Sequence, residues 1–152
     1  MVKAKDIMTT LVTTVSPDTT VEELGRLFIE KGISGAPVVD SKNRLVGIVT
    51  ENDLIKQNMR FHIPTIIRLF DAFIPPGKSE IEKEIKRMSA STVSEICTKE
   101  VITVEPETPL QEIASIIAEK GVHLLPVMSS GKIIGIIGKM DVVKGTMGEV
   151  EK

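Results

Sequence analysis

The sequence contains no tryptophan and no tyrosine, and its 152 residues include only four phenylalanines, two histidines and one cysteine. A ligand site built on indole or phenol rings is therefore excluded. The single cysteine, Cys97, allows no internal disulfide and no cysteine-based zinc site, which favours a reducing cytoplasm. Because the histidines form no i, i+4 pair and no Walker-type Gly-Lys-Ser/Thr loop is present, we expect no metal, no catalytic cofactor and no enzyme activity.

The sequence also has no large excess of charge of one sign and no long apolar run. The net charge is -2, from 19 basic and 21 acidic residues, so the composition indicates no nucleic-acid or anionic-membrane partner. No apolar stretch approaches the ~20 residues of a spanning helix, and the first residues lack the apolar core of a signal peptide. With 41% hydrophobic residues, the chain can still bury a core, and we expect a cytoplasmic protein.

What the sequence does contain is an internal repeat. A shift of 89 residues aligns the segments Thr14-Val15, Glu30-Lys31-Gly32 and Pro37-Val38 with Thr103-Val104, Glu119-Lys120-Gly121 and Pro126-Val127. Beyond the next turn the shift becomes 88, which aligns Gly47-Ile48 with Gly135-Ile136 and Asp53 with Asp141. The lost residue falls at a polar turn, where length changes are tolerated, so the pattern indicates a duplication.

Each copy predicts the element order β-α-β-β-α. In the first copy we expect strands over 12–15, 36–39 and 45–49, a helix capped by Thr19 and ended by Gly32, and a second helix from about Asn52. In the second copy Thr108 repeats the cap, with Pro109 at the first helical position. The predicted fold class is therefore α+β: two such repeats packed sheet to sheet about a pseudo-two-fold axis.

The expected boundaries are repeat 1 over 1–56, a helical insert over 57–91, repeat 2 over 92–145 and a tail over 146–152. The insert holds three of the four phenylalanines, Phe61, Phe70 and Phe73. These side chains either cover the core or a dimer seam, or they form a surface on which a partner docks.

The order of motifs resembles a cystathionine-β-synthase (CBS) domain, and the two copies together resemble the tandem pair called a Bateman module. The resemblance is carried by the segments 6–9, 14–17, 32–38 and 47–54, and by the second copy from Gly121 onward. It implies a regulatory module that binds AMP, ADP, ATP or S-adenosylmethionine in clefts between the repeats. It also implies that modules pair into a disc-like dimer that acts on an unknown downstream protein.

The resemblance assigns a first site around Thr50-x-x-Asp53, where the aspartate holds the ribose diol. A carboxylate can accept from two vicinal hydroxyls, but the same pair could also simply cap the helix. His123 is implied as a donor to the phosphates bound beside Asp53, or it is a satisfied polar residue near the core. The full set predicted for the first site is Thr14, Ile33, Ser34, Ala36, Pro37, Thr50, Asn52, Asp53 and His123.

A second site is predicted around Asp141, where Gly138 replaces the threonine. Lys139 either meets a phosphate there or is a solvated residue at the helix start. The full set for this second site is Thr103, Val122, Leu125, Pro126, Lys139, Met140 and Asp141. The predicted function is an adenine-nucleotide sensor that forms a homodimer. The alternatives are a dimeric interaction scaffold without a nucleotide and, less favoured, an enzyme.

Overall fold

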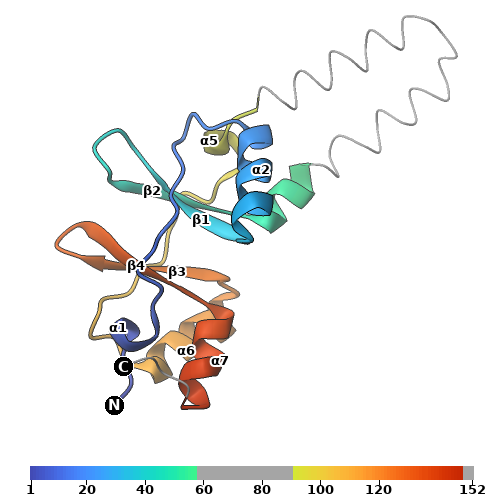
Figure 1. Ribbon diagram of the computed structural model, residues 1–152. Coiled ribbons are helices and arrows are strands. Elements are labelled where there is room, and N and C mark those ends of the chain that lie inside the picture. Colours follow the sequence, from blue (N-terminus) through green and yellow to red (C-terminus); the bar gives the residue numbers. More distant parts are fainter. Residues whose placement is uncertain (58–90, 149–152) are drawn as a thin grey trace, which may run out of the picture.

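The computed structural model describes residues 1–57 and 91–148, which fold into two similar halves (Figure 1). The first half contains α2 (Val21–Lys31), β1 (Gly35–Val39), β2 (Leu45–Thr50) and a helix over residues 51–57. The second half contains α6 (Leu110–Lys120), β3 (Leu124–Ser129), β4 (Lys132–Gly138) and α7 (Lys139–Thr146). Two short helices, α1 (Ala4–Ile7) and α5 (Val93–Ile96), precede these halves in the chain.

Each half is built on an antiparallel hairpin, β1 with β2 and β3 with β4. The register shifts between Val38 and Val39 in the first hairpin and between Val127 and Met128 in the second, which are equivalent positions. The turns differ: Asn43 has a positive φ of 62° in the first, whereas Ser130 and Gly131 have positive φ in the second. The one-residue difference between the copies therefore lies in the turn, as the alignment predicts.

Single bridges extend both hairpins. Val15 pairs in parallel with Val38, and Val104 with Val127, so the predicted strand over 12–15 is reduced to one bridged residue. On the other edge, Ile48 pairs with Thr98 through two backbone hydrogen bonds of 2.9 and 2.8 Å. These added bridges make each sheet wider than its hairpin.

The short helices are exchanged between the halves. Ala4, Ile7 and Met8, in and just after α1, pack into the core of the second half, and Val93, Ile96 and Cys97 around α5 pack into that of the first. Equivalent hydrogen bonds fix both segments: Ala4 N–H donates to the Thr108 carbonyl and Val93 N–H to the Thr19 carbonyl, each at 2.8 Å. Each core is therefore completed by the segment that precedes the other half.

The helix ends follow local chemistry, with two corrections to the sequence-based assignment. Thr20, not Thr19, is the N-cap of α2, and its side chain accepts from Glu23 N–H at 3.1 Å. Thr19 instead accepts from Ser16 N–H and closes the preceding turn. Pro109 is likewise the N-cap of α6 rather than its first helical residue. Gly32 is a left-handed C-cap with φ 62°, as predicted.

The core consists of two clusters, one in each half. Leu24 and Phe28 of α2 lie in the first cluster and Ile113 of α6 in the second, so the apolar stripe of α2 is already covered within its own half. The two halves meet at the axis, where a Cβ on Gly35 would lie 3.1 Å from Leu124 Cδ2. The predicted fold class, two α+β repeats packed together, is thereby confirmed in the described residues.

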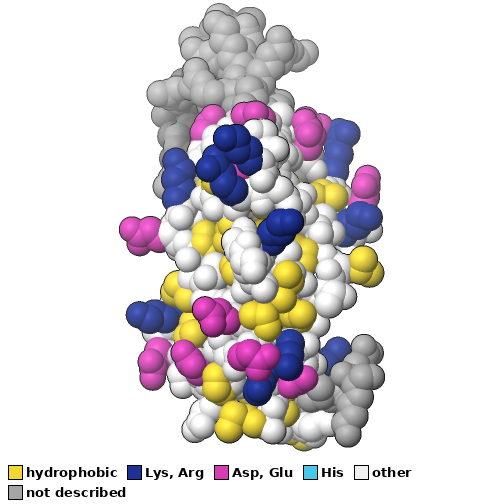
Figure 2. Space-filling model, turned by 90° about the vertical axis from the view of Figure 1, so that its left-hand side faces the viewer, with side chains coloured by type: hydrophobic (Ala, Val, Ile, Leu, Met, Phe, Trp, Pro, Cys, Tyr) yellow, Lys and Arg dark blue, Asp and Glu magenta, His cyan; other side chains and the backbone are white. Residues whose placement is uncertain are grey.

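The surface mixes charges of both signs. On the face shown in Figure 2, lysine, arginine, aspartate and glutamate side chains are interspersed, with apolar atoms exposed between them. No helix in residues 1–57 and 91–148 is long and apolar enough to cross a bilayer. The phenylalanines and the helices predicted for the insert lie outside the described residues.

Candidate functional site

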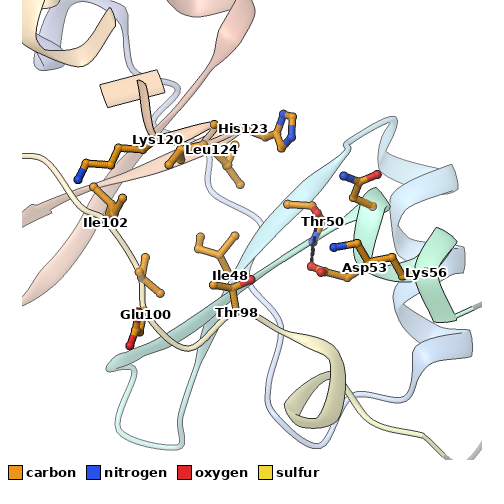
Figure 3. A pocket seen from close by; sticks show the side chains of 14 residues that line it. Ile48, Thr50, Asp53, Lys56, Thr98, Glu100, Ile102, Lys120, His123 and Leu124 are labelled. Carbon is orange, nitrogen blue, oxygen red and sulfur yellow. Dashed lines mark hydrogen bonds between the residues drawn. The ribbon is translucent and has the colours of Figure 1, made fainter. Parts of the chain in front are cut away.

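A cavity of about 360 Å³ lies between the two halves (Figure 3). Its walls come from three stretches: the end of β2 with the helix over 51–57, the crossing segment 98–102, and residues 120–124 from the end of α6 to the start of β3. The lining residues are Ile48, Thr50, Asn52, Asp53, Lys56, Thr98, Glu100, Val101, Ile102, Lys120, Gly121, Val122, His123 and Leu124. The cavity is thus formed jointly by both repeats.

Asp53 is held in place by the capping interaction that the sequence left as one alternative. Thr50 N–H donates to Asp53 Oδ2 at 2.8 Å, and Thr50 Oγ1 lies 3.4 Å from the same oxygen. Within the described part of the chain, Asp53 Oδ1 accepts no hydrogen bond. Capping and ligand binding are therefore compatible, because the cap uses one carboxylate oxygen and leaves the other for a hydroxyl donor.

Asp141 has the same local role in the second half. Gly138 N–H donates to Asp141 Oδ2 at 2.8 Å, although no threonine side chain is present. The backbone bond alone is sufficient to orient this carboxylate at the start of α7. The two aspartates thus make equivalent capping bonds in the two halves, and they differ in the residues that surround them.

Cationic and polar side chains enter the cavity from both repeats. Figure 3 shows Lys56 extending from its helix back toward Thr50 and Asp53, while His123 lies across from them on the other repeat. Lys120 lies at the other end of the cavity, beside Ile102. Neither lysine forms an ion pair with a residue that the structure describes.

The remaining wall is largely apolar. Ile48 is buried, Ile102 and Leu124 lie across from it (Figure 3), and Val122 also lines the cavity. Thr98 is fixed there by its backbone bonds to Ile48. Such a wall suits a flat, mostly apolar ring system, with polar groups at the ends that set its orientation.

Cys97 lies directly behind this wall. A Cβ on Gly47 would approach its Sγ to 2.9 Å, which shows how closely the thiol packs on β2. Burial is the main cause that raises the pKa of Cys97, Asp53 adds to the rise, and Lys99 opposes it. The residue is a packed thiol rather than an activated nucleophile.

Of the residues predicted for the first site, the cavity brings together Thr50, Asn52, Asp53 and His123. Ala36 and Pro37 are fully buried within β1, and Thr14 is exposed just before Val15. The Ser34 carbonyl accepts from Glu51 N–H at 2.8 Å, and Ile33 packs on the first core. None of these other five lines the cavity.

The residues predicted for the second site are also divided. Met140 and Lys139 are exposed and Asp141 is half-buried at the start of α7, whereas Leu125 and Pro126 are fully buried in β3. Thr103 is exposed, and Val122 lines the first cavity. By the internal equivalence Ile33 and Ser34 correspond to Val122 and His123, which line the cavity that contains Asp53.

Sequence reasoning missed all the cavity residues of the crossing segment and both lysines. A signal for three of them exists in the repeat itself: Lys56 matches Lys144, Lys120 matches Lys31, and Thr98 matches Thr9. In the crossing segment Val101 also matches Val12, whereas Glu100 and Ile102 have no identical counterpart and could be placed only by the exchange of segments.

Comparisons with known proteins agree with this architecture. The sequence model of the CBS domain family matches residues 4–60 and 93–148. The chain is 31% identical over 144 residues to the chloroplastic CBS domain-containing protein CBSX1 of Arabidopsis thaliana, covering 88% of this chain and 58% of that protein. The present chain therefore spans somewhat more than half of that relative.

Two solved structures show the same fold. The CBS domain of a CBS domain-containing membrane protein from Sphaerobacter thermophilus superposes with a TM-score of 0.72 at 33% identity, over 95% of this chain and 87% of that one. The structure of CBSX2 in complex with AMP superposes with a TM-score of 0.74 at 26% identity, over 97% and 98% of the two chains.

Proposed function

The chain belongs to the CBS domain family, and we propose that it is a regulatory module that binds an adenosine-containing ligand in the cavity between its repeats. The observation that carries the proposal is the placement of Asp53 at a helix start that faces residues 120–124 of the other repeat across about 360 Å³. That volume lies within the ~300–1,000 Å³ typical of small-molecule pockets. The ligand class comprises AMP, ADP, ATP and S-adenosylmethionine.

The chemistry of the wall supports this class of ligand. Asp53 Oδ1 can accept from the ribose hydroxyls, while Oδ2 keeps its bond from Thr50 N–H. Ile48 and Leu124 provide apolar contacts for the adenine ring. The AMP complex of CBSX2, whose fold covers nearly the whole of this chain, supports the same kind of occupant.

A regulatory module of this kind works through other proteins. We propose a homodimer that reports ligand occupancy in the cytoplasm to a downstream protein. A dimeric scaffold that binds no nucleotide is the second candidate function, and it would act through the insert and the dimer surface.

The two aspartates provide a matched test of the ligand site. Asp53→Ala and Asp141→Ala each remove a cap bond of 2.8 Å and should each cost about 0.5–2 kcal/mol of folding stability. Only Asp53→Ala should also lose about 1.5–3 kcal/mol of AMP affinity, because only Asp53 lines the cavity. Calorimetric titration of AMP into both variants measures this; equal affinity in wild type and Asp53→Ala would contradict the site.

A ligand screen separates the candidate functions. An adenine nucleotide at 100 times its Kd should stabilise a sensor by about 2.7 kcal/mol against thermal unfolding. A scaffold would show no shift with any of the four ligands. Chromatography of the ligand after incubation separates a sensor from an enzyme, since a sensor returns its ligand unchanged.

A further inference from the structure

Lys56 occupies a distinct position within the cavity. It lies three residues after Asp53 on the same helix, it is exposed, and its side chain lines the cavity on the side of Thr50 and Asp53 (Figure 3). No ion pair within the described residues involves it, so its ammonium group is not neutralised by Asp53 or by Glu100. His123 faces this end of the cavity from the second repeat.

The other charged residues of the cavity are arranged differently. One oxygen of Asp53 already accepts from Thr50 N–H, which orients the carboxylate along the helix start. Lys120 is the last residue of α6 and lies at the opposite end of the cavity, so its charge has an ordinary role beside the helix C-terminus. The end beside Asp53 therefore carries one ammonium and one imidazole group, supplied by different repeats.

We infer that Lys56 makes the cavity selective for a nucleoside that carries a phosphate over one that is neutral or cationic. This inference rests on the proposed function, because it places the ribose at Asp53. A ribose held there directs its 5′ substituent to one end of the cavity. A phosphate dianion placed beside Lys56 and His123 gains two charge-assisted hydrogen bonds. The sulfonium group of S-adenosylmethionine would meet repulsion at the same place.

Lys56 also has an ordinary alternative role, as an exposed lysine on a solvated helix. The repeat provides the comparison: Lys144 is the equivalent residue of α7, it is exposed, and it does not line this cavity. Lys120 lines the cavity but at its far end. Lys144 is therefore the matched control for position in the helix, and Lys120 is a comparison for charge elsewhere in the cavity.

The experiment is a set of titrations of AMP, adenosine and S-adenosylmethionine into wild type, Lys56→Gln, Lys120→Gln and Lys144→Gln. We expect wild type to bind AMP more tightly than the other two ligands. Lys56→Gln should lower the ratio of AMP to adenosine affinity by about five- to tenfold, with adenosine affinity unchanged. Lys144→Gln, at a residue outside the cavity, should leave that ratio within about twofold of wild type, and Lys120→Gln should lower it less than Lys56→Gln does.

Charge reversal and added salt sharpen the result. Lys56→Glu should weaken AMP further and strengthen S-adenosylmethionine, and 0.5 M salt should weaken AMP but not adenosine. If adenosine binds and the ratio is the same in Lys56→Gln and wild type, the inference is wrong while the proposed function stands. If none of the three ligands binds wild type, the proposed function fails and the inference fails with it.

Discussion

Asp53 shows how a single side chain can meet a structural and a functional requirement together. Its Oδ2 caps the helix over 51–57 through Thr50 N–H, and this bond holds the carboxylate at the cavity wall. Asp141 repeats the cap without the same polar surroundings, since Gly138 and Met140 stand where the first copy has Thr50 and Asn52. At the scale of a residue, the capping bond explains why both repeats have an aspartate here. The neighbouring side chains explain why the surroundings of the two carboxylates differ.

Part of the site could be predicted at this scale and part could not. Thr50, Asp53 and His123 belong to motifs contained within a few residues, so the sequence locates them. Lys56 lies one helical turn beyond the motif, and only the direction of its side chain brings it into the cavity. Ser34 stays a prediction: its carbonyl accepts from Glu51 N–H beside the start of this helix, but the residue does not line the cavity.

Glu107 gives a prediction about pH. Lys3 and Lys5 lie 2.5 and 2.8 Å from its carboxylate and lower its pKa to about 2. A carboxyl group with a depressed pKa stabilises the fold above about pH 4.5 and loses this contribution as the pH falls toward 2. Glu107→Gln should therefore lower the unfolding temperature slightly at pH 7 and not at all near pH 2, and it should raise amide exchange at Ala4 and Lys5.

The control for this prediction is Glu105→Gln. Glu105 lies on the same loop, and its carboxylate makes no ion pair with any residue the structure describes. If the difference in unfolding temperature between Glu107→Gln and wild type did not depend on pH, the ion pairs of Glu107 with the two lysines would not stabilise the N-terminal segment. Because all three side chains are partly exposed, added salt should reduce the effect.

At the scale of elements, the hairpins and helix ends could be predicted from local sequence, whereas the exchange of the two short helices could not. The hairpins follow from short apolar runs beside polar turns, and the left-handed cap at Gly32 follows from its place after a helix. The cap of α2 shifts from Thr19 to Thr20 because adjacent threonines offer the same chemistry. The exchange of α1 and α5 depends on contacts about 100 residues apart in sequence, which no local pattern records.

The packing of the exchanged segment on β2 predicts the effect of one added methyl group. A Cβ on Gly47 would lie 2.9 Å from Cys97 Sγ and 3.0 Å from the Thr98 carbonyl oxygen, and a backbone oxygen cannot rotate away. Gly47→Ala should cost about 1–3 kcal/mol of folding stability, measured by denaturant unfolding.

Gly25→Ala is the matched control, because Gly25 lies inside α2 with no heavy atom within 4 Å of its built Cβ. That substitution should add up to about 1 kcal/mol through helix propensity. Equal stability of the two variants would show that segment 97–98 does not press on β2.

At the scale of the whole molecule, the expected dimer needs a surface other than the apolar stripe of α2. Leu24 and Phe28 are buried in the first core and are not available to a partner. Ile55 and Val143 are 54% and 50% exposed, and they occupy equivalent positions on the helix over 51–57 and on α7. An apolar residue exposed at the same place in both repeats is the kind of surface that an isologous interface covers.

Light scattering at micromolar concentration should therefore give a mass of about twice 16.6 kDa. Replacing Ile55 and Val143 together by lysine should shift the protein toward monomer. The control is Ile29→Lys, since Ile29 is 84% exposed on α2 and its equivalent is Ala118. A strictly monomeric wild type would contradict the dimer.

The exchange of α1 and α5 also bears on the ancestry of the chain. Residues 4–8 complete the core of the second half, and residues 93–97 complete that of the first. If each repeat were a separate chain, two such chains could reach the same packing only by exchanging their N-terminal segments. Joining them end to end removes the need for two molecules to meet. The present chain then preserves, within one polypeptide, an association between two copies of a smaller ancestor.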